Sequence, residues 1–291
     1  MNFITSGITL GALMSLAAGA AGAHAFDLEE HSSSQQTLHF ASSGARTLEV
    51  RAITGAITIE AYDGADVEVL INKTINGRSR ADIEAATREV KLDTADNGGA
   101  VSLIVRYPNE STCGEKDVRW SHWKQKNYDV RYDFTIRVPK DTRLELCTIN
   151  RGDIAVNGTR ADFSIHTING RITMTDVGGS GEATTINGRV TAAFAAAPRE
   201  DSLFKTINGD VVLEMPDALA ADLRMKTFNG GLYTDFEVQP LPTAVNVSSR
   251  QQDGRFVYRT SGFTSVRAGA GGPDLTLETL NGDVRVLRHS K

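Results

Sequence analysis

The residues best suited to bind or react gather in one stretch, residues 107–128. This stretch holds both tryptophans, Trp120 and Trp123, with His122 between them and three lysines and one arginine around them. Interleaved aromatic rings and cations can stack on sugars or bind an anionic polymer. The same composition also fits a long loop whose rings pack against the body of the protein. Trp120, His122 and Trp123 are therefore candidate binding residues, with packing as the alternative.

The sequence lacks the common catalytic and metal-binding patterns. Its six histidines are scattered, without the H-x-x-x-H or H-x-x-E-H spacing of a zinc site. No G-x-S-x-G elbow, phosphate-binding loop or dinucleotide fingerprint occurs. A β-helical enzyme that cleaves polysaccharides would need two or three carboxylates converging on one sugar. We therefore predict no catalytic residue, no metal and no cofactor, and we expect that the protein is not an enzyme.

The chain has two cysteines, Cys113 and Cys147. In an oxidising compartment they could form a disulfide, and closing a loop of this length would contribute about 3–4 kcal/mol to stability. The alternative is two separate buried thiols.

A repeat of the form Thr-x-Asn-Gly dominates the second half of the sequence. Its copies follow one another at intervals of 18 to 21 residues, except the last, which follows after 52 residues. A further, degenerate copy is Ile53-Thr54-Gly55-Ala56-Ile57. The repeated positions are Thr148, Asn150, Thr167, Asn169, Gly170, Thr185, Asn187, Gly188, Thr206, Asn208, Gly209, Thr227, Asn229, Gly230, Thr279, Asn281 and Gly282.

Each copy predicts a strand, a tight corner and a second strand. Thr, Ile, Val and Phe favour extended backbone, and Asn-Gly tolerates the positive φ of a sharp turn. A meander of hairpins would place turns every 8 to 12 residues. A period of 18 to 21 residues instead matches one coil of a solenoid. We expect an all-β, single-stranded-type β-helix or β-solenoid over residues 146–291, with an insertion at 233–272.

The alternation of side chains along a strand divides the repeat into columns. The Thr and Asn positions share one side, and stacked amides can bond from coil to coil, so an inward Asn column is acceptable. The opposite column is Ile149, Ile168, Ile186, Ile207, Phe228 and Leu280. We expect this apolar column to be buried, because most apolar columns of solenoids form the core. The alternative is an exposed apolar stripe that binds a partner.

The position after each glycine varies and is expected to face solvent; it holds Arg171, Arg189, Asp210, Gly231 and Asp283. Arg189 and Asp210 are predicted to form a cross-strand ion pair. The first copy has an additional residue, which creates the tripeptide Arg151-Gly152-Asp153. This tripeptide is either an integrin-type recognition motif or, as we favour, a bulge of one residue at a corner.

The N-terminal part predicts export. An uncharged apolar stretch from Ile8 ends in Ala23-His24-Ala25, so residues 1–25 have the form of a signal peptide, with a retained N-terminal anchor as the alternative. Residues 26–36 are predicted to be a flexible tail. Residues 37–145 are predicted to form a β section that caps the solenoid, with one helix at Ser79–Thr87 and a turn at Asn97-Gly98.

The overall charge excludes one class of partner. The chain has 31 basic and 36 acidic residues, and the two signs are interspersed. Nucleic-acid binding would require a concentrated basic face. No second apolar stretch follows the signal peptide, so we expect no membrane span after cleavage and a periplasmic or secreted location.

Three features together resemble the bacterial "putative adhesin" family of domains of unknown function. They are the run from Tyr128 to Pro139, the segment Leu144-Glu145-Leu146, and the repeats of the form T-x-N-G-x-[IV]. The closing segment from Gly269 to Val284 is also similar to the end of such domains. The resemblance implies an exported β-helical protein and carries over no catalytic residue. It does not extend to the tryptophan-rich stretch.

The leading hypothesis is a non-catalytic envelope protein whose β-helical wall binds an unidentified envelope protein or polymer. An envelope stress-sensing or signalling-associated module is the alternative, and a polysaccharide-acting enzyme is a minor one.

Overall fold

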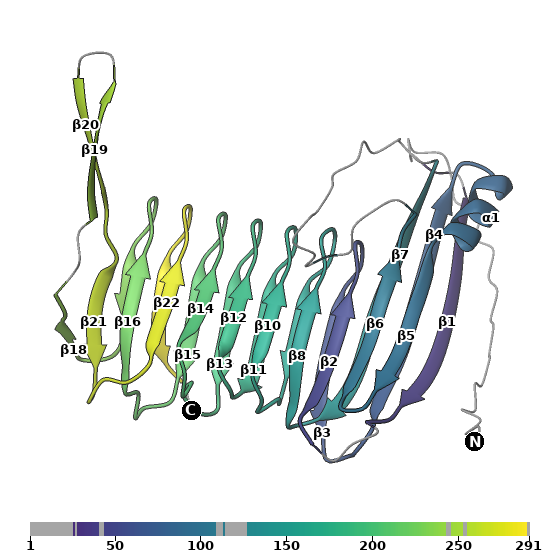
Figure 1. Ribbon diagram of the computed structural model, residues 1–291, viewed down its shortest axis with the longest axis horizontal. Helices are drawn as coiled ribbons and strands as arrows, with labels where there is room; N and C mark the ends of the chain where they lie inside the picture. The colour runs from purple at the N-terminus through teal and green to yellow at the C-terminus, as the bar shows by residue number, and fades with distance from the viewer. Residues whose placement is uncertain are drawn as a thin grey trace.

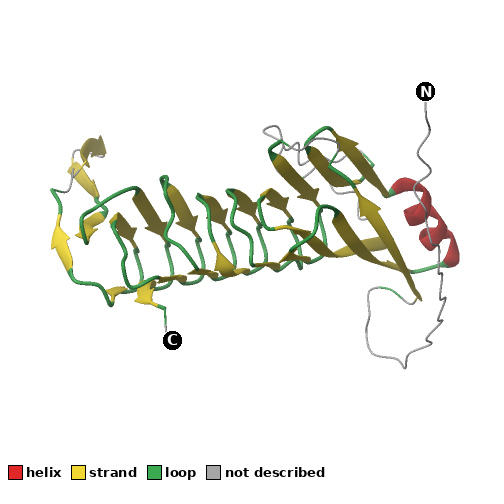
Figure 2. Cartoon of the chain, turned by 90° about the horizontal axis from the view of Figure 1, so that it is seen from below, coloured by secondary structure: helices red, strands yellow, loops and turns green. Residues whose placement is uncertain are grey.

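The computed structural model describes residues 26, 28–40, 44–108, 113, 127–242, 246–252 and 255–289, the segments 246–252 and 255–261 by their backbone alone. These residues form an all-β protein with two large mixed sheets that face each other as two layers along the molecule (Figures 1 and 2). A hairpin and one described helix complete it. The all-β prediction is confirmed.

We name the ten-stranded sheet A and the eleven-stranded sheet B. Sheet A contains, in spatial order, β1 (Leu28–Leu38), β4 (Val67–Gly77), β7 (Tyr128–Pro139), β3 (Ile57–Tyr62), β9 (Ile154–Asn157), β11 (Ile172–Val177), β13 (Val190–Phe194), β15 (Val211–Met215), β23 (Val284–Arg288) and β17 (Leu232–Thr234). Sheet B contains β18 (Val238–Pro240), β21 (Thr264–Ala268), β16 (Ala221–Lys226), β22 (Asp274–Glu278), β14 (Ser202–Lys205), β12 (Gly181–Thr184), β10 (Phe163–His166), β8 (Thr142–Cys147), β2 (Arg46–Arg51), β6 (Ala100–Arg106) and β5 (Lys91–Asn97). The hairpin consists of β19 (Asn246–Gln252) and β20 (Arg255–Ser261), and the helix is α1 (Arg80–Glu89).

From β8 to β17 the chain alternates between the two sheets, and it does so again from β22 to β23. Each sheet B strand in these two stretches ends at a corner of the Thr-x-Asn repeat, and the next strand lies in sheet A. Equivalent strands pair in parallel with equivalent residues opposite one another, as Ile165 of β10 and Ala183 of β12 show. The corners therefore stack along one edge of the molecule, where the sheet B arrowheads point in Figure 1.

The hydrophobic core lies between the sheets. Alternate residues of each strand face inward, and the large ones are fully buried, as in the cluster of Phe163, Phe194 and Phe204. The rings of Phe194 and Phe204 meet edge to face, with their centroids 5.9 Å apart, a favourable geometry for aromatic pairs. This core fixes both sheets and thereby the position of every corner.

The repeats do not stack in the order of the chain. The last repeat supplies β22 and β23, and these strands lie between those of the two preceding repeats: β22 between β14 and β16, and β23 between β15 and β17. The segment between β17 and β22, which includes β18, the hairpin and β21, makes this return possible. The spacing of the repeats alone predicts that they stack in the order in which they occur in the chain. The last repeat does not follow this order, because it lies between the two repeats that precede it.

The N-terminal section differs from its prediction at one place. Residues 26–36 are predicted to be a flexible tail, whereas residues 28–38 form β1, which pairs with β4 along its whole length. Strand pairing uses backbone groups, so a polar, Ser- and Gln-rich sequence does not exclude it. The predicted helix is present as α1, with Ser79 as its N-cap, and the predicted hairpin is β5–β6, turning at Gly98.

Among the described residues, no helix is both long and apolar enough to cross a membrane.

Candidate functional site

Each corner begins at its threonine, where the strand of sheet B has already ended. The threonine side chains are buried or nearly so, and their hydroxyls bond to the backbone of a neighbouring corner. Thr206 Oγ1, for example, donates to the carbonyl oxygen of Gly188 at 2.8 Å. The same bond joins Thr148 to Gly55, Thr167 to Gly152, Thr185 to Gly170, Thr279 to Gly209, and Thr227 to Gly282.

Glycine is required where successive corners touch. Gly209 has φ of +149°, and a Cβ placed on it would lie 2.2 Å from the carbonyl oxygen of Gly188. Both the backbone conformation and the close approach exclude a side chain there. The Asn-Gly pair is thus a packing requirement of the stack as well as a turn signal.

The asparagines form a ladder on the surface, which corrects the predicted inward column. Asn169, Asn187, Asn208, Asn229 and Asn281 are exposed. Each donates its side-chain amide to the Oδ1 of the next asparagine at 2.7 to 3.0 Å, so the ladder runs from Asn150 to Asn229. Side chains alternate only along an extended strand, and the chain turns between Thr and Asn.

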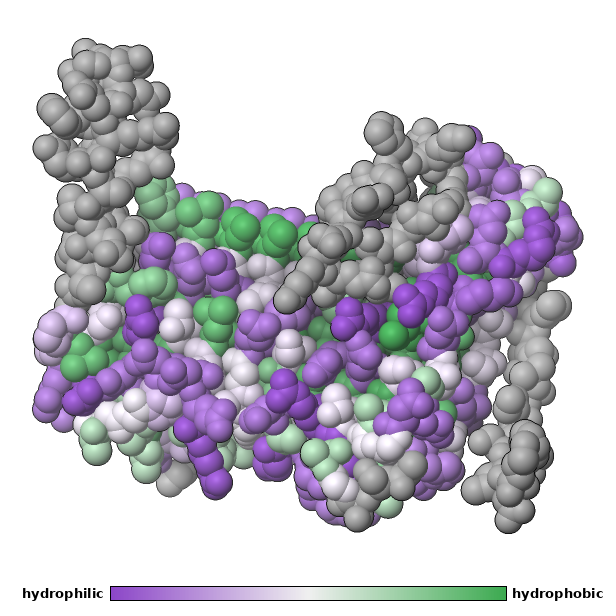
Figure 3. Space-filling view, in the orientation of Figure 1, coloured by the Kyte–Doolittle hydropathy of each residue, from purple (hydrophilic) through white to green (hydrophobic). Residues whose placement is uncertain are grey.

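The apolar column beside the ladder is largely exposed, and the favoured prediction of burial is wrong for this part. Ile186, Ile207, Leu280 and Phe228 are 39%, 36%, 46% and 77% exposed, and Ile168 is half-buried. We name these five residues the corner stripe. In stacking order they run Ile168, Ile186, Ile207, Leu280, Phe228, as the bridges between the adjacent asparagines show. Figure 3 shows a green apolar row along this edge.

One end of the column is covered. Cys113 and Cys147 form a disulfide, with their Cα atoms 5.7 Å apart. The disulfide packs with Ile53 and Ile149, which are 6% and 9% exposed, and Ile168 lies against this cluster. Arg51 Nη1 donates to the carbonyl oxygen of Cys113 at 2.9 Å and so helps to hold Cys113 over this end. The exposed part of the stripe therefore begins where this cover ends.

A charged row borders the stripe on the sheet B side. Glu278 lies between Lys205 and Lys226, with ion pairs of 2.9 and 3.2 Å. Burial alone would raise the pKa of Glu278, but the hydrogen bonds from both lysines outweigh it and hold the pKa below its ordinary value. This carboxylate is ionised at neutral pH, so the row of two lysines and one glutamate carries one net positive charge.

Aspartates close the corners on the sheet A side. Asp210 accepts from the backbone N–H of Asp283 at 3.0 Å, and Asp283 accepts from that of Gly231 at 2.9 Å. The hydrogen bond from Arg285, followed by that from Gly231, holds the pKa of Asp283 below its ordinary value. Arg189 and Asp210 form the predicted ion pair, 2.6 Å long. These charges are engaged in holding neighbouring repeats together.

The tripeptide Arg151-Gly152-Asp153 is part of the first corner. Arg151 has φ of +51°, as expected for an additional residue at a turn. Asp153 accepts the backbone N–H of Arg171 at 2.8 Å, and Gly152 is buried. The interpretation as a bulge at a corner accounts for these contacts.

His166 makes contacts that sequence reasoning missed. Its Nδ1 lies 2.7 Å from Thr184 Oγ1, and its Nε2 lies 2.9 Å from Glu182 Oε1 and 3.0 Å from Ser164 Oγ. The four residues are neighbours on β10 and β12, with partly exposed side chains. Only the parallel pairing of these strands brings them together, because eighteen residues separate His166 from Thr184.

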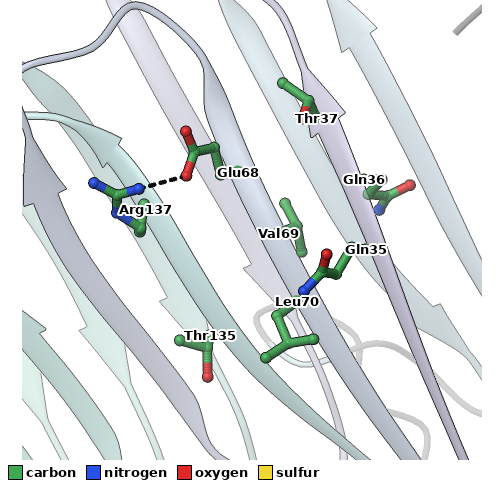
Figure 4. A pocket seen from close by; sticks show the side chains of 8 residues that line it. All are labelled: Gln35, Gln36, Thr37, Glu68, Val69, Leu70, Thr135 and Arg137. Atoms are coloured by element: carbon green, nitrogen blue, oxygen red, sulfur yellow. Dashed lines mark hydrogen bonds and ion pairs between the residues drawn. The ribbon is translucent and has the colours of Figure 1, made fainter. Parts of the chain in front are cut away.

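A second candidate is a hollow of about 490 Å³ at the N-terminal end of sheet A (Figure 4). It is lined by Gln35, Gln36, Thr37, Glu68, Val69, Leu70, Thr135 and Arg137. Its two charged side chains are bound to each other, since Arg137 Nη1 lies 2.7 Å from Glu68 Oε2. Arg137 also lies over the ring of Tyr62, 4.5 Å from its centroid. The hollow therefore presents no uncommitted charge to a ligand, and its other polar side chains are those of Gln35, Gln36, Thr37 and Thr135.

Some predicted positions fall outside the described residues. These are Trp120, His122, Trp123 and the signal peptide at 1–25. Within the described part of the chain, no group of three or more His, Cys, Asp or Glu side chains could hold a metal ion.

No protein-family model matches the chain, and neither does any curated protein. A "putative cell adhesion protein" from Clostridium sporogenes aligns over 89% of this chain and 100% of its own, with 8% identity and a TM-score of 0.42. A "putative adhesin" from Bacteroides fragilis aligns over 88% and 97%, with 10% identity and a TM-score of 0.36. A "putative lipid binding protein" from Parabacteroides distasonis aligns over 89% and 97%, with 12% identity and a TM-score of 0.28. In all three cases the likeness is distant.

Proposed function

We propose that this chain is an exported, non-catalytic β-solenoid of the cell envelope that binds a partner through its corner stripe. The observation that carries the proposal is the exposure of four consecutive apolar side chains, Ile186, Ile207, Leu280 and Phe228, along one edge. Contiguous apolar surface rimmed by polar groups is typical of binding sites in soluble proteins. Here the Asn ladder and the Lys205–Glu278–Lys226 row supply the polar rim.

The backing of the stripe is rigid, which favours binding. Each stripe residue lies between a buried threonine and a laddered asparagine, and both are bonded to neighbouring corners. A surface held in one conformation loses little entropy when a partner binds. The spacing of the side chains equals the spacing of paired strands, about 4.8 Å. The stripe is therefore suited to a narrow, extended partner, such as a polymer chain or a protein segment.

The charges near the stripe support a partner recognised by apolar contact. The carboxylates of Glu278, Asp210 and Asp283 are all hydrogen-bonded within the protein. Asp210 and Asp283 are neighbours on the sheet A side, where each accepts a backbone N–H of the next corner, and Glu278 on the sheet B side is paired with two lysines. A glycosidase would need an acid and a base that are both directed at one sugar. Binding without turnover is the function that this edge supports best.

The test compares the purified chain with two variants. The first replaces Ile186, Ile207 and Phe228 with threonine, which is polar and, like isoleucine, β-branched. The second, Leu28→Thr, removes an apolar side chain that is as exposed as Ile186, at 39%, but lies on β1. Binding is measured against peptidoglycan, lipopolysaccharide, a glycan array, phospholipid vesicles and solubilised envelope proteins.

We expect the triple variant to lose binding by about tenfold or more, since burying each apolar side chain contributes more than about 1 kcal/mol. The Leu28→Thr variant should bind as the original chain does. Binding that survives the triple substitution would assign the partner to another surface. Turnover of any polysaccharide in the panel would overturn the non-catalytic part of the proposal.

A further inference from the structure

The two sheets have four edge strands, and these differ greatly in how well they are protected from pairing with another chain. At one end of the molecule, sheet A finishes in β17 and sheet B in β18, which have three residues each, and β18 ends in Pro240. At the other end, sheet B finishes in β5, whose seven residues include Lys91, Asp93 and Asp96. Short strands, prolines and charges are the devices that prevent an edge strand from pairing with another chain.

The fourth end, β1, lacks these devices. It is eleven residues long and pairs with β4 without a bulge. It contains no proline and no lysine, and its charged side chains are confined to its first four residues. The segment from Ser32 to Leu38 is uncharged. No described strand pairs with its outer side, so that side presents unpaired backbone N–H and C=O groups.

A buried polar atom in the same segment lacks a partner. The side-chain nitrogen of Gln36 is buried and makes no hydrogen bond within the described structure. Buried amide groups are ordinarily hydrogen-bonded, and an exception calls for an acceptor from elsewhere. Gln36 lies on the edge strand itself, beside the hollow shown in Figure 4.

We propose that a second copy of this chain pairs with β1 through the segment Ser32–Leu38, antiparallel to it and around a two-fold axis at Gln35. In this register Gln35 faces its own equivalent, and Ser34 of the second copy faces Gln36. Facing residues of antiparallel strands have their side chains on the same side of the sheet. The hydroxyl of that serine is then the acceptor for the Gln36 amide.

The charges of β1 favour this register. All seven residues of the segment are uncharged, so no like charges face each other across the axis. Full overlap of the strands would instead bring the Glu30 end into the interface, where Arg80 of α1 lies 3.7 Å from the Glu30 carboxylate. A peptide partner would draw its specificity from pockets beyond the edge, whereas Ser, Gln and Thr side chains are suited to pair with their own kind. A two-fold axis makes the contact self-complementary.

The expected dimer is weak and reversible, because seven residues per strand bury less than the roughly 1,200 Å² of a stable interface. Sedimentation equilibrium of the purified chain from about 1 μM to about 1 mM should therefore show a monomer–dimer equilibrium. Gln35→Lys places two cations opposite each other at the axis and should weaken the dimer by about tenfold or more. Gln35→Glu should do the same with two anions. Gln35 is exposed, so neither substitution disturbs the core.

Mixing the two variants provides the decisive result. An equimolar mixture of Gln35→Lys and Gln35→Glu should dimerise at least as well as the original chain, because opposite charges then meet at the axis. Thr94→Lys, on the exposed edge of β5, is the matched control and should leave the equilibrium unchanged. The proposal is overturned if the original chain is monomeric throughout, if Gln35→Lys leaves the dimer intact, or if the mixture stays monomeric. Circular dichroism of each variant verifies the fold.

Discussion

The side-chain amide of Asn208 donates a 2.7 Å hydrogen bond to Oδ1 of Asn187, which lies 21 residues earlier in the chain. The bond joins two corners on the surface, and the same bond recurs along the whole ladder. Each asparagine in the interior of the ladder therefore takes part in two such bonds, and Asn229 at its end takes part in one.

Asn187→Ala should destabilise the protein by about 1 kcal/mol, and Asn229→Ala by about half as much. The first removes two ladder bonds and the second removes one, and a typical hydrogen bond contributes about 0.5–1.5 kcal/mol net. The lower part of this range applies because the groups left behind are exposed to water. Urea unfolding of both variants gives the comparison. Equal losses would show that the loss does not depend on the number of ladder bonds removed.

Gly209→Ala should destabilise the protein far more than Gly98→Ala. At Gly209 the new Cβ would lie 2.2 Å from the carbonyl oxygen of Gly188, so the two corners must separate. At Gly98, with φ of +64°, no atom lies within 4 Å of the new Cβ, and only the cost of the left-handed backbone remains, about 1 kcal/mol. Thermal unfolding measures the difference. If the two variants unfold alike, the contact between corners does not constrain the stack.

Reduction of the disulfide should cost about 3–4 kcal/mol, because the bond closes a loop across a sequence separation of 34 residues. It should also increase binding of a hydrophobic dye, because Ile53 and Ile149 are covered by Cys113 and Cys147. Urea unfolding and dye fluorescence, with and without reductant, test both results. A matched Cys113→Ser, Cys147→Ser variant should behave as the reduced chain. Unchanged dye binding would show that the cover is held by other contacts.

Glu278 should add an acid-dependent contribution to stability. Its two lysine partners hold its pKa in the folded state below the ordinary value of 4.5. The stabilisation is therefore fully present above about pH 4.5 and is lost as the pH falls through the lower folded-state pKa. The side chain is partly exposed, so the contribution is at most about 1 kcal/mol. Comparing Glu278→Gln with the original chain in urea between neutral and acidic pH measures it; a difference that does not shrink on acidification would contradict it.

The Thr-x-Asn-Gly spacing predicts the strand–corner–strand unit because the corner chemistry is local. Asn-Gly requires a turn wherever it stands between strand-forming residues. The sequence predicts less well which columns face solvent, because the alternation rule assumes extended backbone through Asn208, whereas β14 already ends at Lys205. The exposed face of Ile207 follows from this end of the strand.

Two further features could not be predicted from composition or spacing. β1 is polar on nearly every residue, and its pairing with β4 depends on backbone groups that every sequence has. The last repeat contacts β14 because residues 233–272 lead the chain back past β16. The gap of 52 residues between the last two repeats does not reveal which strand the last repeat will pair with. Such non-local contacts are decided by tertiary structure.

The position of β22 and β23 determines the order in which the protein can be completed. Each of these strands contacts the preceding repeats on both sides, so β16 and β17 cannot join the strands before them until β22 and β23 have been made. A chain that emerges from its N-terminus can add repeats one by one only as far as β15. The last step among the described strands is then the insertion of β22 and β23 between strands made earlier, and a chain cut before β22 is left with an unfilled gap between two sets of strand edges.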